Sequence, residues 1–488
     1  ATATILADSI LRHKNPFPST WNYANGDVWA FTFHLLVLPF VHVIHNQSLL
    51  RMIVSAFWIL FACGCACKLS KFVFRDFSHL LIIPFFCLFI IGSDDVVLYQ
   101  VAYTSQLIWQ SVSLVLVWSA HGILNKNGIS AFWRKKEFIN VFIYSFIAFF
   151  LMTLGGSRNL GEIVLPLFLT IIILAIIEIA IENKDLKTLG GKTFLLLLII
   201  LIPSVLGFIC YKHIAISHNV NNTVNNAMNF IGDYQSWWNN FQNIFVTHFA
   251  NFGIHTNVPA FSIVGLKNFV IIIFTLLISF IIPILQLIKA RNETKSIIFV
   301  CLFTLIHNTL MFLLFVFFEK TSRRYLLSSQ FLEIIISSRY IYVYWIKKNC
   351  SAFARNILVS IIVLGIGVNS LYFLGMSKNW KQNLENKKSF ASWIMSSGAK
   401  KCYATYWNAY TNEVYSNLGI RFGAVNFDGK NFFPYFWLVD SDAYDYLESK
   451  RSCLLLSENE KPNDLIIESI FGEPEQTMQR DGYTFFVF

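Results

Sequence analysis

The sequence predicts an α-helical protein that crosses a membrane many times and carries a small α/β domain at its C-terminal end. Of the 488 residues, 55% are hydrophobic and only 14% are charged, whereas soluble domains carry about 25% charged residues. Long apolar runs recur with short basic breaks between them, as expected for membrane-spanning helices. After about residue 375 the composition becomes polar and aromatic.

The apolar runs indicate ten spans, and an eleventh is expected upstream. The chain opens on the apolar segment "ATATILA", which would form the last turns of that upstream helix. The ten spans lie at roughly 48–67, 77–92, 101–124, 138–154, 163–182, 193–210, 268–288, 296–318, 325–345 and 356–374.

Lysine and arginine concentrate in alternate loops between these spans. The positive-inside rule places such loops in the cytoplasm, which leaves the other loops and the C-terminal domain outside. Because loop charges account for most of the net charge of +10, that charge does not indicate nucleic-acid binding. The outer loops are then 8–47, 92–99, 211–267 and 319–324.

Two apolar or aromatic segments of the outer loops are not interpreted as spans. A crossing at 29–45 would reverse every later loop, so we expect an interfacial or re-entrant helix there. The stretch "IGDYQSWWNNFQNIF" is aromatic and amphipathic, which predicts a helix lying in the headgroup plane.

The composition divides the chain into a membrane domain, 1–375, and an α/β domain, 376–488. Alternating apolar patterns predict strands at "KKCYATYW", "IRFGAVNF", "RSCLLLSE" and "GYTFFVF", with short helices at "AYTNEVYSN" and "SDAYDYLESK". Cys402 and Cys453 lie in this domain, and we expect them to pair if the domain is exported.

Several carboxylates fall on the predicted outer face, where a charge is costly unless it is paired or used. Asp8 follows the apolar start, Asp27 lies in "WNYANGDVWAF", and Asp94 and Asp95 lie in "GSDD". Helix capping would explain Asp94 or Asp95 but not both. We interpret this group as catalytic or acceptor-positioning, with capping as the alternative.

Arginines and aromatic side chains lie in the same predicted layer. Arg158 sits in "LGGSRNLGE", and Arg323 and Arg324 sit in "EKTSRRYLLSS". Guanidinium groups suit bidentate recognition of phosphate; the alternative is contact with lipid headgroups. Trp21 and Trp29 are candidates for stacking on a sugar, or else ordinary residues of an interfacial aromatic belt.

Acids and arginines on one outer face suggest sugar transfer from a polyprenyl-phosphate donor. Arginine would bind the phosphate and stabilise its charge as the sugar leaves. A carboxylate would act as general base on a hydroxyl of a glycan or glycolipid acceptor. The reaction would be an inverting displacement, with membrane lipid as the third partner.

The elements just quoted, together with "NPFPSTWNYANGD" and "RRYLL", resemble the GT-C superfamily of integral-membrane glycosyltransferases. The resemblance implies a bacterial inner-membrane enzyme of the type that modifies O-antigen or lipopolysaccharide, with a C-terminal domain in the periplasm. It implies Asp8 as the first-loop catalytic aspartate, Asp27 being a rival, and Asp94 or Asp95 as the second-loop acid. Arg324 and Tyr325 would lie near the carrier phosphate.

Metal and histidine chemistry is less well supported. The sequence has no clear paired metal motif, so we expect no cofactor and no metal dependence. His34, His42 and His45 would share one helical face with no acid beside them, which favours a satisfied or headgroup-facing role. Glu333, inside the ninth span, is the intramembrane acid that a structural role explains least well.

Other functions remain open on the sequence alone. A flippase or transporter of lipid-linked saccharides would usually show internal repeats or interrupted helices with buried ionisable groups; no repeat is evident, and the polar residues cluster on one face instead. A polymerase or ligase of such saccharides often carries arginines in a large outer loop, but 211–267 has none. A receptor-like scaffold is disfavoured by the number of spans.

Overall fold

The structure, a computed structural model, divides into two compact units. The mixed unit consists of Ala1–Trp58, Tyr211–Thr223 and Gly375–Phe488, and the helical unit of Ile59–Cys210 and Val224–Leu374. The residues that the structure describes are 1–24, 27–30, 32–74, 104–127, 136–182, 186–218, 229–254, 258–289, 294–318, 326–347, 351–352, 378–444 and 451–488, with 356, 360, 363, 367, 371 and 374.

Seven described helical segments are long and apolar enough to span a membrane, which is compatible with a multi-pass membrane protein. They match seven of the ten predicted spans. The span predicted at 77–92 lies outside the described residues, and only isolated residues of 356–374 are described. The segment predicted at 325–345 is present as the helix Leu327–Tyr340 followed by the π-helical segment Ile341–Lys347, and it is not among the seven. The seven are Gln47–Phe74, Ser105–Lys126, Lys136–Leu154, Ser157–Ala180, Leu189–Ser217, Asn268–Ile288 and Lys295–Phe317.

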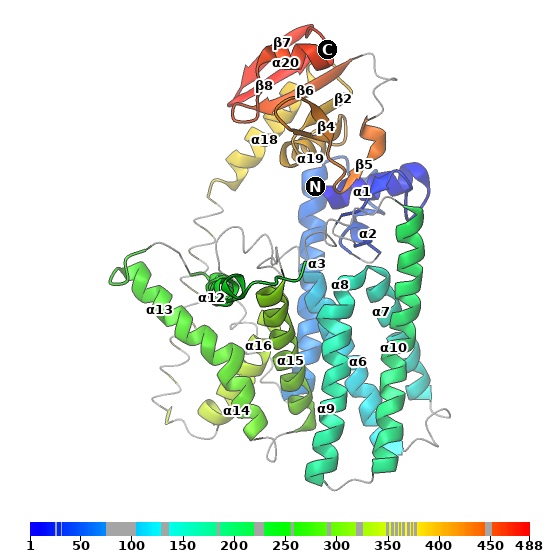
Figure 1. The fold of residues 1–488 in the computed structure, drawn as a ribbon, viewed down its shortest axis with the longest axis vertical. Helices are drawn as coiled ribbons and strands as arrows, with labels where there is room; N and C mark the ends of the chain where they lie inside the picture. The colour runs from blue at the N-terminus through cyan, green and yellow to red at the C-terminus, as the bar shows by residue number, and fades with distance from the viewer. Residues whose placement is uncertain are drawn as a thin grey trace. The chain divides into compact units, whose positions relative to one another are not determined.

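The helical unit is built around α15 (Lys295–Phe317). This helix packs against α9, α12, α14 and α16, and Figure 1 shows it beside α16. Short π-helical segments interrupt several helices. The other described elements that lie wholly or partly in this unit are α3 (Gln47–Phe74), α6 (Thr104–Asn127), α7 (Lys136–Leu154), α8 (Ser157–Asn159), η3 (Leu160–Val164), α9 (Leu165–Glu182), α10 (Leu186–Ser217), α12 (Tyr234–Ala250), α13 (Ile263–Leu276), η4 (Leu277–Ile281), α14 (Ile282–Ile288), α16 (Leu327–Tyr340) and η7 (Ile341–Lys347).

The helix predicted from "IGDYQSWWNNFQNIF" is present as α12. It begins after Asp233, whose carboxylate accepts hydrogen bonds from the backbone N–H groups of Gln235 and Ser236, at 3.0 and 2.9 Å. Such a cap satisfies donors that the first turn leaves without partners. Asp233 therefore has a structural role, while the position of α12 in the headgroup plane stays a prediction.

The C-terminal part of the mixed unit is a six-stranded sheet in the order β4-β3-β2-β6-β8-β7 (Figure 1). Strand β2 pairs in parallel with β3 and β6, and the remaining pairs are antiparallel. The strands are β2 (Lys401–Ala404), β3 (Arg421–Phe427), β4 (Phe432–Pro434), β6 (Ser452–Ser457), β7 (Gln476–Arg480) and β8 (Tyr483–Val487). The helices are α18 (Trp380–Met395), α19 (Tyr406–Tyr415) and α20 (Asp464–Phe471).

These elements confirm the four predicted strands and the predicted helix at α19. The helix predicted at 441–450 begins as the short 3-10 turn η8, Ser441–Tyr444, and the rest of it lies outside the described residues. Cys402 and Cys453 stand opposite each other on β2 and β6, with Cα atoms 4.4 Å apart, and form a disulfide. The expected pairing of these cysteines is therefore present.

The N-terminal residues of the mixed unit pack against this domain. Helix α1 (Thr2–His13) contacts α2 (His34–Val37), α19 and β5 (Val439–Asp440), and Figure 1 shows α1 next to β5. Strand β1 (Trp21–Asn22) pairs antiparallel with β5. The segment 29–45 holds the four-residue helix α2 followed by turns, which is too short to cross a membrane.

Candidate active site

The mixed unit contains a cavity of about 340 Å³ with charged walls. Its walls come from α1, β2, α19, β3, β5 and η8, so the N-terminal helix and the C-terminal domain build it together. The lining residues are Ile5, Arg12, Lys401, Tyr410, Glu413, Arg421, Phe422, Val439, Asp440, Asp442 and Ala443.

Asp8 does not line the cavity, but its carboxylate contacts two arginines that do. Its Oδ2 atom accepts hydrogen bonds from Arg12 Nε, 2.9 Å away, and from Arg421 Nη2, 2.5 Å away. Its Oδ1 atom is 3.0 Å from His42 Nε2. Arg12 is one helical turn from Asp8 on α1, so the helix itself brings these two side chains together.

The surroundings of Asp8 favour its ionised form. Burial alone would raise the pKa of this carboxyl, but the charge of Arg421 and the hydrogen bonds from His42, Arg421 and Arg12 lower the pKa below its ordinary value. A carboxylate with a lowered pKa is a weak base. The geometry therefore gives Asp8 the role of fixing the two guanidinium groups.

Arg12 also bonds two acids on the opposite wall. Its Nη2 atom donates to Asp440 Oδ2 at 2.5 Å, and its Nη1 atom donates to Asp442 Oδ2 at 3.2 Å. Asp440 is fixed by the pairing of β5 with β1, in which it stands opposite Trp21. The β1–β5 ladder thus positions an acid that orients Arg12.

Glu413 is the carboxyl of this site that titrates near neutrality. It is buried on α19, where its Oε1 atom accepts from Arg421 Nη1 at 3.0 Å and its Oε2 atom from the Phe422 N–H at 3.1 Å. Burial raises the pKa of Glu413 to about 7, although the charge of Arg421 opposes the shift. A carboxyl with this pKa exchanges a proton readily at physiological pH.

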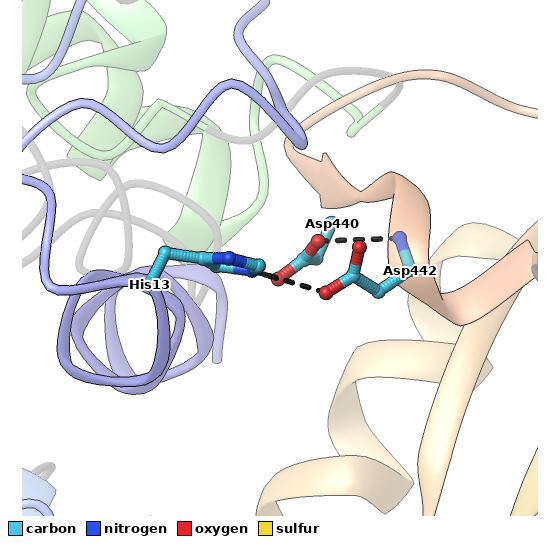
Figure 2. Close-up of side chains that lie close together, drawn as sticks. All are labelled: His13, Asp440 and Asp442. Atoms are coloured by element: carbon cyan, nitrogen blue, oxygen red, sulfur yellow. Dashed lines mark hydrogen bonds and ion pairs between the residues drawn. The ribbon is translucent and has the colours of Figure 1, made fainter.

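His13, Asp440 and Asp442 have a spacing that also suits a metal ion (Figure 2). One ligand atom from each lies within 4.8 Å of the others. The Arg12 guanidinium, however, already contacts both carboxylates, and His13 Nε2 is 3.0 Å from Asp442 Oδ2. The protein thus supplies its own cation there, and metal independence stays a prediction.

The structure places the predicted site residues in different parts of the molecule. Asp8 and the half-buried Asp27 and Trp29 belong to the mixed unit, whereas Arg158 belongs to the helical unit, where it pairs with Glu162 at 3.4 Å. Trp21 is fully buried, so its ring offers no open face to a sugar. Asp94, Asp95, Arg323, Arg324 and Tyr325 lie outside the described residues.

Sequence reasoning missed most of the charged residues around Asp8. Arg12 had a detectable signal, because an acid and an arginine four residues apart on a helix are neighbours. The interpretation that no acid accompanies His42 was wrong, since Asp8 contacts it from 34 positions away. Arg421 lies 413 positions from Asp8 and had no local signal.

Comparisons with protein-family models, curated proteins and solved structures found no match to this chain. The fold and the cavity thus define a class only. The described residues form a mostly helical protein with seven helices long and apolar enough to cross a membrane and a strand-containing C-terminal domain, and a charged cavity lies within the mixed unit.

Proposed function

We propose that the protein transfers a sugar from a polyprenyl-phosphate donor to a hydroxyl group of a glycan or glycolipid acceptor. The observation that carries this proposal is the cavity of the mixed unit. It combines two arginines held by carboxylates with a buried glutamate whose pKa is about 7. The two arginines are suited to binding a phosphate, and the glutamate is suited to the role of general base.

In this proposal the roles differ from those expected from sequence. Arg12 and Arg421 bind the donor phosphate, with Asp8 as a positioning residue for both. The sequence favours Asp8 as the base, but a carboxylate with a lowered pKa accepts a proton poorly, so we assign that role to Glu413. Both guanidiniums have five N–H donors, so their bonds to carboxylates leave donors for the phosphate.

The proposed step also balances charge. The acceptor oxygen forms a bond to the anomeric carbon, while the bond from that carbon to the phosphate oxygen breaks and its electron pair stays with the phosphate. The acceptor proton passes to Glu413. The site therefore loses one negative charge when the carrier phosphate gains one, which limits the electrostatic cost in a partly buried site.

The proposal also predicts on which side of the membrane the site lies. We infer ten to eleven spans and an extracytoplasmic C-terminal domain in a bacterial inner membrane, as in the resemblance to GT-C glycosyltransferases. The positive-inside distribution supports this orientation. The Cys402–Cys453 disulfide supports it independently, because structural disulfides persist in oxidising compartments.

Turnover of a lipid-linked donor tests the function. The full chain in lipid nanodiscs, given undecaprenyl-phosphate hexoses and bacterial glycolipid extract, is expected to release undecaprenyl phosphate. Asp8→Asn should reduce release at least tenfold, because both arginines lose a charged partner. Asp464→Asn, at an exposed site of the same unit, should retain it. Equal release by Asp8→Asn and wild type would contradict the proposal.

A second candidate, proton-coupled transport of a lipid-linked saccharide, is favoured by a different observation. Glu333 and His248 are both fully buried in the helical unit. Buried ionisable groups among spanning helices are typical of proton relays in transporters. We prefer the proposal of a glycosyltransferase because the cavity of the mixed unit supplies both phosphate-binding and proton-accepting groups.

A further inference from the structure

Four polar side chains from four elements meet inside the helical unit. Glu333 on α16 and Ser279 on η4 have no solvent exposure, and His248 on α12 and Asn308 on α15 are at most 2% exposed. Burying such groups is costly unless they hydrogen-bond one another. Each of the four side chains therefore needs hydrogen-bond partners within the unit.

The hydrogen bonds run in a chain through Ser279. The Ser279 hydroxyl donates to Glu333 Oε2 at 2.6 Å, and Asn308 Nδ2 donates to Glu333 Oε1 at 2.8 Å. His248 Nε2 lies 2.9 Å from Ser279 Oγ and 3.9 Å from Glu333 Oε2. Ser279 thus links the imidazole to the carboxyl.

The hydrogen bonds between His248, Ser279 and Glu333 can be oriented in two ways. A serine hydroxyl has a single hydrogen, so when Glu333 is ionised Ser279 donates to it and His248 Nε2–H donates to Ser279. When Glu333 is protonated, its O–H donates to Ser279, which in turn donates to His248 Nε2. Both arrangements use the same atoms, so a proton can change sides without any backbone movement.

Charge decides how many protons the cluster holds. An ionised Glu333 beside a neutral His248 gives the cluster a single buried negative charge. One added proton makes the cluster neutral, whether it sits on the carboxyl or on the imidazole. Two other ionisable side chains of α15 and α16 make hydrogen bonds outside the cluster: Arg339 donates to Gln286 Oε1 at 3.3 Å, and His307 Nε2 lies 3.5 Å from Gln110 Nε2.

Two further observations indicate a place for proton entry rather than a closed structural network. The Nδ1 atom of His248 is buried and has no hydrogen-bond partner in the described part of the chain. Ser279 lies in the π-helical segment Leu277–Ile281, and such π-bulges are frequent at functional sites. A buried nitrogen without a hydrogen-bond partner calls for an explanation, and proton entry supplies one.

We propose that Glu333, Ser279 and His248 form a one-proton exchange site in the helical unit, with Asn308 fixing the carboxyl. Its ligand is the proton, which enters at His248 Nδ1 and is shared with Glu333 through the Ser279 hydroxyl. Because His248 belongs to α12, the proton also stabilises the contacts that His248 makes with η4, α15 and α16. The site is independent of the sugar-transfer chemistry proposed for the mixed unit.

Infrared difference spectroscopy of the full chain in liposomes tests this site. In a Glu413→Gln background, which removes the glutamate whose pKa is about 7, lowering the pH of protein with [13C]carboxyl-labelled glutamate should produce a protonated-carboxyl component that is lost in Glu333→Gln. Glu178→Gln is the matched control, since Glu178 is also buried in the helical unit but pairs with Lys295 at 3.2 Å. That control should retain the band.

Two variants that keep Glu333 make the test robust to misfolding. His248→Gln and Ser279→Ala should each move the pH midpoint of the band by about one unit, a tenfold change in proton affinity, because each breaks the sharing of the proton. Difference spectra that are identical with and without Glu333→Gln would overturn the proposal. An unchanged midpoint in both other variants would overturn it equally.

Discussion

Replacing Arg421 with alanine is expected to weaken the binding of undecaprenyl phosphate by about 10²–10³-fold, since truncating one partner of a buried charge pair costs about 2–5 kcal/mol. Arg421 donates to Asp8 and to Glu413 and also lines the cavity. Its loss removes a phosphate contact and leaves two acids to repel the anion. Native mass spectrometry of the full chain in detergent measures the bound fraction.

Two variants make the Arg421 result interpretable. Arg421→Lys keeps the charge but not the two-pronged geometry, so it should bind with intermediate affinity. Arg451→Ala removes an arginine of the same domain that is 45% exposed and pairs with Glu475, and it should bind like wild type. Wild-type affinity in Arg421→Ala would show that the carrier phosphate binds elsewhere.

Replacing Glu413 with glutamine is expected to lower the rate of sugar transfer by about 10²–10⁴-fold, the usual contribution of a positioned general base. Donor binding should change far less, because the amide still occupies the same volume beside Arg421. Single-turnover measurements with a hexosyl donor separate the two effects. Glu468→Gln, at an exposed position of α20, serves as the control.

The pH profile of wild type gives an independent check on Glu413. Burial raises its pKa to about 7, and a general base acts only when deprotonated. The rate should therefore be low below about pH 6, rise through about pH 7, and level off above about pH 8. A rate that falls as pH rises through 7 would assign Glu413 the opposite role, that of an acid.

Membrane topology was the part of the fold most accessible from sequence. A spanning helix is a local property, set by about 20 consecutive apolar residues, so α7 and α15 begin within two residues of their predicted starts. The strands β2, β3, β6 and β8 were likewise visible as short apolar or aromatic runs. Strand β7, with the polar sequence "QTMQR", pairs only because β8 lies beside it.

The candidate site was far less accessible, because long-range packing assembles it. Asp8 stood out as an acid directly after an apolar run, and the structure places it among charged partners. Those partners include Arg421 on β3 and Glu413 on α19, more than 400 positions away. Nothing in either local sequence indicates that a C-terminal strand and helix pack against α1.

Photo-crosslinking tests the central claim, that a lipid-linked phosphate binds in the cavity of the mixed unit. The full chain in nanodiscs is labelled with an undecaprenyl-phosphate analogue that carries a diazirine next to the phosphate, and the labelled peptides are identified by mass spectrometry. The account predicts labels on Thr2–His13 and Arg421–Phe427 that unlabelled undecaprenyl phosphate displaces and Arg421→Ala abolishes. Displaceable labels confined to the helical unit, and unaffected by Arg421→Ala, would contradict it.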